Sequence, residues 1–173
     1  PFTERGGTDA EFLAQQVDER AMCVVVGYPN FFGVIEDLAP VRALCDRAGA
    51  LLATVTTEPL SLALLKPPGE LGADIAVGEG QSLGVPMALG GPGFGFFTCQ
   101  KRFVRSMPGR LAGETVDSEG RRGFVLTLAT REQHIRREKA TSNICTAQVL
   151  LGVMAGMYAV YHGPAGLRRI ALR

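Results

Sequence analysis

The chain has 173 residues, of which 46% are hydrophobic and 20% are charged, and its formal net charge is +1. This length suits about one domain and this composition supplies a sizeable apolar core, which excludes an intrinsically disordered protein. The small net charge excludes a general attraction to nucleic acid or to membrane surfaces. Pro1 is not an initiator residue and the sequence stops inside a helical pattern, so we expect a piece of a longer protein that is cut at both ends.

Alternating strand and helix signals fill the first 100 residues. Short β-branched runs predict strands, and apolar residues at helical spacing that end at Gly49 predict a helix. In chain order we expect a strand at 21–29, a helix at 34–50, a strand at 51–59, a short helix or turn at 60–65, and strands at 73–80, 93–100 and 124–130. The order strand, helix, strand predicts an α/β fold with a mostly parallel sheet and flanking helices.

Ligands on such sheets usually bind beyond the carboxyl ends of the strands, and candidate residues follow the predicted strands there. These residues are Tyr28, Pro29 and Asn30 after the first strand, Glu58 after the second, and Glu79 and Gln81 after the third. No GxGxxG motif followed by an acidic residue and no Walker-type lysine is present. The sequence therefore disfavours a nucleotide-binding sheet.

The second half of the chain contains a long segment with the composition of a loop and a segment rich in basic residues. Residues 105–123 have loop composition, and a loop of this length in a compact domain is more often functional than idle. Residues 101–139 contain ten Lys or Arg against five Asp or Glu. This segment either faces an acidic partner or is a solvated surface. Binding to nucleic acid is disfavoured because only two aromatic residues, Phe103 and Phe124, lie among the charges.

The four cysteines are far apart in the sequence and the two histidines are not clustered, so neither a metal site nor a disulfide framework is predicted. Reduced thiols are typical of the cytoplasm or an organelle matrix. The apolar run at 144–161 contains polar residues and glycines, which favour a core helix over a membrane span.

Three segments resemble the glycine cleavage system P-protein family, and specifically its N-terminal half or separate subunit 1. In chain order they read PNFFG with KPPGELGADIAVGEGQSLG, then MPGRLAGETVDSEGRRGFVLTL, then REQHIRREKATSNICTAQ. The resemblance implies that residues 1–173 are part of the large domain of a fold-type-I, aspartate-aminotransferase-like enzyme that depends on pyridoxal phosphate (PLP). The family's reaction releases CO2 from glycine and passes the aminomethyl group to the lipoyl group of the H-protein, with the cofactor as electron sink.

The expected covalent anchor for PLP is missing from this chain. Such a cofactor needs a lysine at the end of a sheet strand, and the only lysines are Lys66, Lys101 and Lys139, none in that setting. When the two halves of the family are set against each other, Gln81 and Ser82 stand where the catalytic half has a histidine and a lysine. The resemblance thus implies that the lysine lies on the C-terminal half or on subunit 2, and that this chain completes a site at their interface.

The segment KATSN at 139–143 resembles a loop that reaches the cofactor phosphate of the neighbouring subunit in related enzymes. By this resemblance Thr141, Ser142 and Asn143 are candidate phosphate ligands, aided by the start of a helix expected from Ile144. Alternatively, Thr141 or Ser142 simply caps that helix.

Two further residues are candidates for the site. His134 is a candidate for proton transfer near neutral pH, and Arg137 for holding the carboxylate of glycine. Both lie among alternating Glu and Arg residues, a pattern that also fits a salt-bridged surface. The rival hypothesis is a non-catalytic scaffold or regulatory subunit with an aminotransferase-like fold. The expected location is the cytoplasm of a bacterium or archaeon, or the mitochondrial matrix of a eukaryote.

Overall fold

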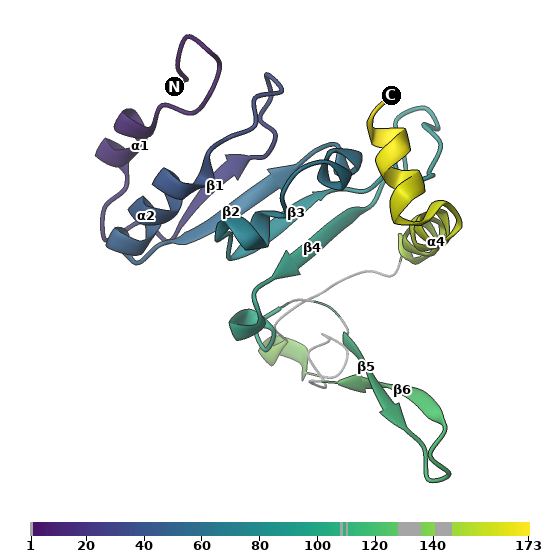
Figure 1. The fold of residues 1–173 in the computed structure, drawn as a ribbon. Helices are drawn as coiled ribbons and strands as arrows, with labels where there is room; N and C mark the ends of the chain where they lie inside the picture. The colour runs from purple at the N-terminus through teal and green to yellow at the C-terminus, as the bar shows by residue number, and fades with distance from the viewer. Residues whose placement is uncertain (1, 108, 110, 128–135, 141–146) are drawn as a thin grey trace. The chain divides into compact units, whose positions relative to one another are not determined.

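The computed structural model describes residues 2–107, 109, 111–127, 136–140 and 147–173 (Figure 1). They fall into two units, each of which is described by itself. The first unit comprises Pro1–Gln100 with Gln148–Arg173, and the second comprises Lys101–Ala147.

The first unit is built on a four-stranded sheet. In spatial order its strands are β1 (Cys23–Gly27), β2 (Leu51–Thr56), β3 (Ile75–Glu79) and β4 (Gly95–Cys99). The first three strands run parallel and β4 runs antiparallel to β3 (Figure 1). This confirms the predicted mostly parallel sheet, and each strand is shorter than its apolar run because its ends bend into the flanking loops.

Helices cover one face of this sheet. They are α1 (Ala10–Gln16), α2 (Leu38–Ala48) and the short 3₁₀ helices η1 (Pro59–Ala63) and η2 (Pro68–Leu71). The side chain of Asp9 caps α1 and that of Asp37 caps α2, and α2 ends at Gly49, whose φ is 71°. The helix α1 was not among the predicted elements.

The hydrophobic core lies between these helices and the covered face of the sheet. Val24, Val26 and Leu52 point to this face and pack against Leu38 and Cys45 of α2. The opposite face is apolar but open, with Val25 63% and Phe97 38% exposed. A hollow of about 520 Å³ lies on the open face over β2, β3 and β4.

A buried ion pair fixes the amino ends of β2 and β3. Arg42 of α2 donates from Nη1 to Asp74 Oδ2 at 2.8 Å, and Asp74, which directly precedes β3, is 1% exposed. The same carboxylate accepts the backbone N–H of Leu52, and Arg42 also bonds the backbone oxygens of Gly72 and Ala50. This ion pair and its backbone hydrogen bonds thus hold the helix and the sheet together.

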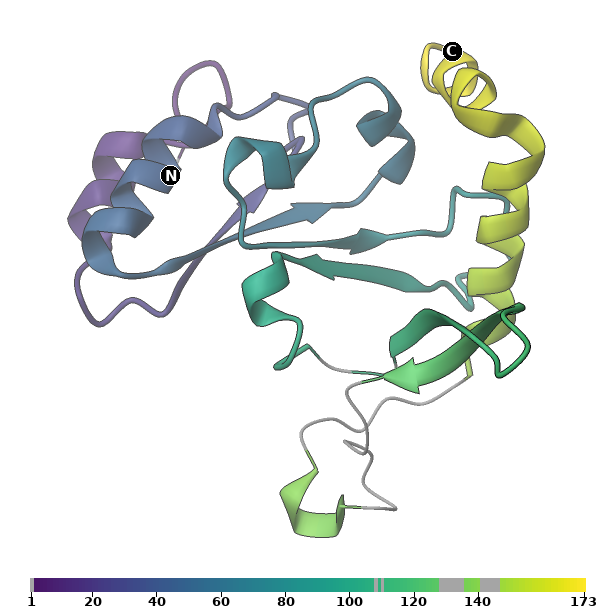
Figure 2. The same ribbon diagram turned by 60° about the horizontal axis from the view of Figure 1, so that its bottom comes forward.

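The long helix α4 (Val149–Ala171) completes the first unit and packs against η1. Ile144, where we expected this helix to start, lies outside the described residues; Ala147 and Gln148 form a turn, and the described helix begins at Val149. Gly163 has φ 62° and ψ 175°, so the helix changes direction there, next to Pro164 (Figure 2). No helix in the described part of the chain is long and apolar enough to cross a membrane.

The second unit contains an antiparallel hairpin of β5 (Leu111–Val116) and β6 (Arg122–Thr127). The predicted loop at 105–123 is therefore wrong over much of its length, and the strand predicted at 124–130 begins at Arg122 and pairs with β5 instead of joining the parallel sheet. Most side chains of this hairpin are exposed. Its strands therefore lack the alternation of buried apolar and exposed polar residues by which a half-buried strand is predicted from sequence. The unit also contains the 3₁₀ helices η3 (Lys101–Phe103) and η4 (Arg137–Lys139).

Candidate functional site

The carboxyl ends of β2 and β3 meet through one hydrogen bond. Ser82 Oγ donates to Glu58 Oε1 at 2.6 Å, and the same oxygen accepts the backbone N–H of Leu60 at 2.9 Å. Glu58 therefore caps η1 and ties it to the turn after β3. Sequence reasoning singled out both residues but not their contact, although adjacent parallel strands necessarily bring their ends together.

The turn after β3 is held by a second carboxylate. Glu79 Oε1 accepts the backbone N–H groups of Gly80, Gln81 and Phe94 at 3.0, 3.0 and 3.2 Å. The side-chain amide of Gln81 donates to the backbone oxygen of Val85. Both polar side chains at this strand end are thus engaged in shaping the loop that leads to β4.

A hollow of about 340 Å³ lies beside this turn. Its lining residues are Glu79, Gln81, Pro86, Met87, Gly90, Gly91, Pro92 and Gly93. A Cβ at position 93 would stand 3.0 Å from Glu79 Oε1, so the loop approaches the carboxylate as closely as glycine permits.

Tyr28, directly after β1, belongs to the core. It is 2% exposed, its hydroxyl donates to the backbone oxygen of Lys66 at 3.2 Å, and Thr56 Oγ1 donates to its backbone oxygen at 2.8 Å. Burial raises the pKa of Tyr28. Its phenol is therefore a structural donor and stays protonated at neutral pH.

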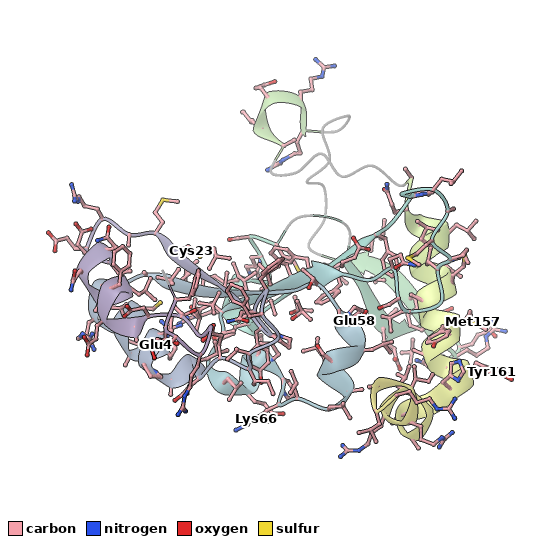
Figure 3. The ribbon with its side chains drawn as sticks, turned by 90° about the horizontal axis from the view of Figure 1, so that it is seen from above. Glu4, Cys23, Glu58, Lys66, Met157 and Tyr161 are labelled. Carbon is pink, nitrogen blue, oxygen red and sulfur yellow. The ribbon has the colours of Figure 1, made fainter. Side chains whose placement is uncertain are left out.

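None of the three lysines directly follows the carboxyl end of one of the parallel strands in the four-stranded sheet. Lys66 is exposed between η1 and η2, and it is well separated from Glu58 in Figure 3. Lys101 follows β4, whose last residue Cys99 pairs with Ile75 at the opposite, amino end of β3. Lys139 is exposed at the end of η4 in the second unit.

The described strand-end residues do not fit a covalently bound PLP. An imine requires an amine, and the turn after β3 presents the Ser82 hydroxyl, which is already bonded to Glu58. In the part of the chain that the structure describes, no three His, Cys, Asp or Glu side chains are grouped closely enough to hold a metal ion.

The remaining candidates lie in the second unit. Arg137 is an exposed residue of η4 with φ 53°. His134, Thr141, Ser142 and Asn143 lie outside the described residues. Their roles stay predictions.

The family profile described as "Glycine cleavage system P-protein" matches residues 6–173. The chain is 57% identical over 165 residues to the probable glycine dehydrogenase (decarboxylating) subunit 1 of Sphingopyxis alaskensis, covering 95% of this chain and 36% of that protein. It is 54% identical over 171 residues to the protein of the same name from Anaeromyxobacter dehalogenans, covering 99% and 38%. The chain thus spans little more than a third of the length of these relatives.

Solved structures agree with this assignment. A crystal structure of glycine decarboxylase (P-protein) of the glycine cleavage system, in inhibitor-bound form, matches with a TM-score of 0.83 and 58% identity over 88% of this chain and 35% of that one. A sphingosine-1-phosphate lyase of Burkholderia pseudomallei, with a TM-score of 0.58 and 17% identity, covers 99% of this chain and 37% of its own, and shares the fold alone. The chain has the α/β fold of fold-type-I PLP-dependent enzymes and belongs to the glycine cleavage system P-protein family.

Proposed function

We propose that this chain is the lysine-lacking part, N-terminal half or subunit 1, of a PLP-dependent glycine decarboxylase. The whole enzyme releases CO2 from glycine and passes the aminomethyl group to the lipoyl group of the H-protein. All 173 residues belong to the large domain of this enzyme, which works in the cytoplasm. The observation that carries the proposal is the Ser82–Glu58 hydrogen bond at the strand ends, where a PLP enzyme requires an amine.

In this proposal the lysine-bearing C-terminal half or subunit 2 holds PLP covalently. The name "subunit 1" of the relatives supports the existence of such a companion. The chain's own Glu58 and Ser82 brace the strand ends against each other, so they keep the edge of the sheet in a fixed shape for the companion to meet.

The segment 134–143 contributes the groups that act in the shared site. Thr141, Ser142 and Asn143 bind the cofactor phosphate through hydroxyl, amide and backbone donors. Arg137 holds the glycine carboxylate, and its exposure in η4 leaves its guanidinium available for two-point binding. His134 moves a proton near neutral pH.

The test combines the full-length polypeptide with its companion subunit, glycine and H-protein. The double variant Thr141→Ala with Asn143→Ala is expected to weaken PLP binding at least about tenfold, because two donors to a phosphate dianion are lost. The control Ser118→Ala removes an exposed hydroxyl from the hairpin turn and is expected to leave binding unchanged. PLP affinity and turnover unchanged in the double variant would instead favour the scaffold hypothesis.

A further inference from the structure

Three phenylalanine rings gather at the surface beyond the end of β1. The rings of Phe2 and Phe32 lie 4.9 Å apart between centroids, and those of Phe31 and Phe32 lie 5.4 Å apart. Their side chains remain 65%, 96% and 55% exposed in the order Phe2, Phe31, Phe32. Rings that contact one another and yet face solvent form an apolar patch, here called the aromatic cluster.

The loop that carries the aromatic cluster is fastened by Asn30. Its Oδ1 accepts the backbone N–H groups of Phe32 and Val34 at 2.9 and 3.0 Å. Its Nδ2 donates to the backbone oxygen of Gly6 and to Glu36 Oε1, each at 2.7 Å. One amide side chain thus joins the loop after β1 to the segment that bears Phe2.

Glu36 and Gly6 complete this fastening. Thr8 donates to Glu36 through both its backbone N–H and its hydroxyl. Gly6 has φ 77°, and a Cβ there would stand 3.2 Å from Phe32 Cβ, so glycine allows the two segments to touch. The rings are therefore presented on a scaffold that is ordered before any partner arrives.

Preorganised, exposed aromatic residues are the usual anchors of protein interfaces. They bury a large area while little conformational entropy is lost, and such anchors carry most of the binding energy. The aromatic cluster follows the carboxyl end of β1. In the same parallel part of the sheet, Glu58 follows the carboxyl end of β2 and Ser82 lies in the turn after β3. It therefore lies on the edge where the proposed function needs a companion.

The charges around the aromatic cluster select the kind of partner. The two segments that carry the rings, 2–12 and 30–37, contain five Asp or Glu and one Arg. The acidic surplus of these two segments repels anionic membranes and nucleic acids, and it attracts a protein surface that carries Lys or Arg around an apolar pocket.

We propose that the aromatic cluster is an anchor through which this chain binds its companion subunit, in an apolar pocket rimmed by basic residues. This inference rests on the proposed function and adds the surface that joins the two subunits. Phe31, the most exposed ring, enters deepest, and Phe2 and Phe32 support it from the side.

The experiment measures binding of the companion subunit to the full-length polypeptide by titration calorimetry. The double variant Phe31→Ala with Phe32→Ala is expected to bind about 30-fold or more weakly, the loss typical of anchor residues. The control Met22→Ala truncates an apolar side chain that is 85% exposed just before the amino end of β1, and it is expected to bind like the wild type. Raising the salt concentration is expected to weaken binding of the wild type, because salt screens the attraction between the acidic segments and a basic partner.

Three results would overturn the inference. One is equal affinity of the double variant and the wild type. Another is a lowered melting temperature of the double variant in the isolated full-length polypeptide, since rings covered by the rest of that polypeptide are not available to a partner. The third is retention of the wild type, but not the variant, on phosphatidylserine vesicles. If the wild type itself does not bind the companion subunit, it is the proposed function that fails.

Discussion

A carboxylate accepts hydrogen bonds at the amino ends of the strands of the four-stranded sheet and another does so at their carboxyl ends, but the first is buried and the second is exposed. At the amino edge Asp74 is 1% exposed and accepts bonds from Arg42 and from the backbone of Leu52. At the carboxyl edge Glu58 is exposed and accepts bonds from Ser82 and from the backbone of Leu60. Water can replace a lost hydrogen-bond partner only at the exposed carboxyl ends of the strands. We therefore expect substitutions at the amino ends to destabilise the fold strongly and substitutions at the carboxyl ends to destabilise it little.

The largest loss of stability is expected when the buried carboxylate of Asp74 is removed. Burial alone would lower the pKa of Arg42, but the hydrogen bonds that Arg42 donates to Asp74 and Asp46 outweigh it and raise that pKa, so the guanidinium stays charged. Asp74→Ala leaves this charge without its buried partner and is expected to lower the free energy of unfolding by about 3–5 kcal/mol. Urea denaturation measures the loss.

The same arginine supplies the matched control. Asp46 lies 2.8 Å from Arg42 Nη2 but is 67% exposed, and Asp46→Ala is expected to cost less than about 1 kcal/mol. Equal losses for Asp74→Ala and Asp46→Ala would contradict the claim that depth decides the outcome.

A substitution at Gly78 tests whether the sheet is also tightly packed near the carboxyl end of β3. A Cβ there would overlap the backbone oxygen of Thr56 and the ring of Phe96, and the backbone atom cannot turn aside. Gly78→Ala is expected to destabilise the protein by about 1–3 kcal/mol, as overpacking does. In Gly95→Ala the Cβ meets only the oxygen of Gly78 at 3.4 Å, so thermal denaturation is expected to separate the two variants clearly.

Ser82→Ala measures how much the exposed hydrogen bond between Ser82 and Glu58 contributes to stability. Glu58 keeps its bond from Leu60 and gains water in place of the serine hydroxyl, so the expected loss of stability is below about 1 kcal/mol. Chemical denaturation measures it beside Asp74→Ala. A loss as large as that of Asp74→Ala would show that the strand-end bond belongs to the fold and not to the site.

The smallest effect is expected at Asp117, a solvent-exposed carboxylate at the turn of the β5–β6 hairpin. Backbone and side-chain hydrogen bonds from Arg121 lower the pKa of Asp117 from its usual value of 3.8. The stabilisation is present above 3.8 and is lost as the pH falls through the lowered pKa. The Arg121 amide resonance is expected to follow this titration, and the variant Asp117→Asn to show none.

The sequence predicts the parallel part of the sheet well, because β-branched runs buried on one or both faces leave a strong signal. The reversed direction of β4 is consistent with its connection: residues 80–94 contain no helix, and a parallel crossover usually requires one. The helix α1 was missed although Asp9 precedes Leu13 and Val17 at helical spacing, because all its residues remain partly or fully exposed.

The site was less predictable than the fold. Counting lysines predicts that the covalent anchor lies on a companion, but only the structure shows Ser82 bonded to Glu58, since a contact between the segments that follow two strands depends on tertiary packing. The aromatic cluster was also not predicted from the sequence, because the exposure of Phe31 and the hydrogen bonds by which Asn30 holds its loop depend on the fold around β1.

The most direct test of the account is to locate the cofactor in the reconstituted enzyme. The complex is reduced with borohydride, digested, and searched by mass spectrometry for pyridoxyl-lysine. The account predicts that Lys66, Lys101 and Lys139 carry no stoichiometric adduct and that the modified lysine lies in the companion. One equivalent of pyridoxyl group on any of these three lysines would contradict it.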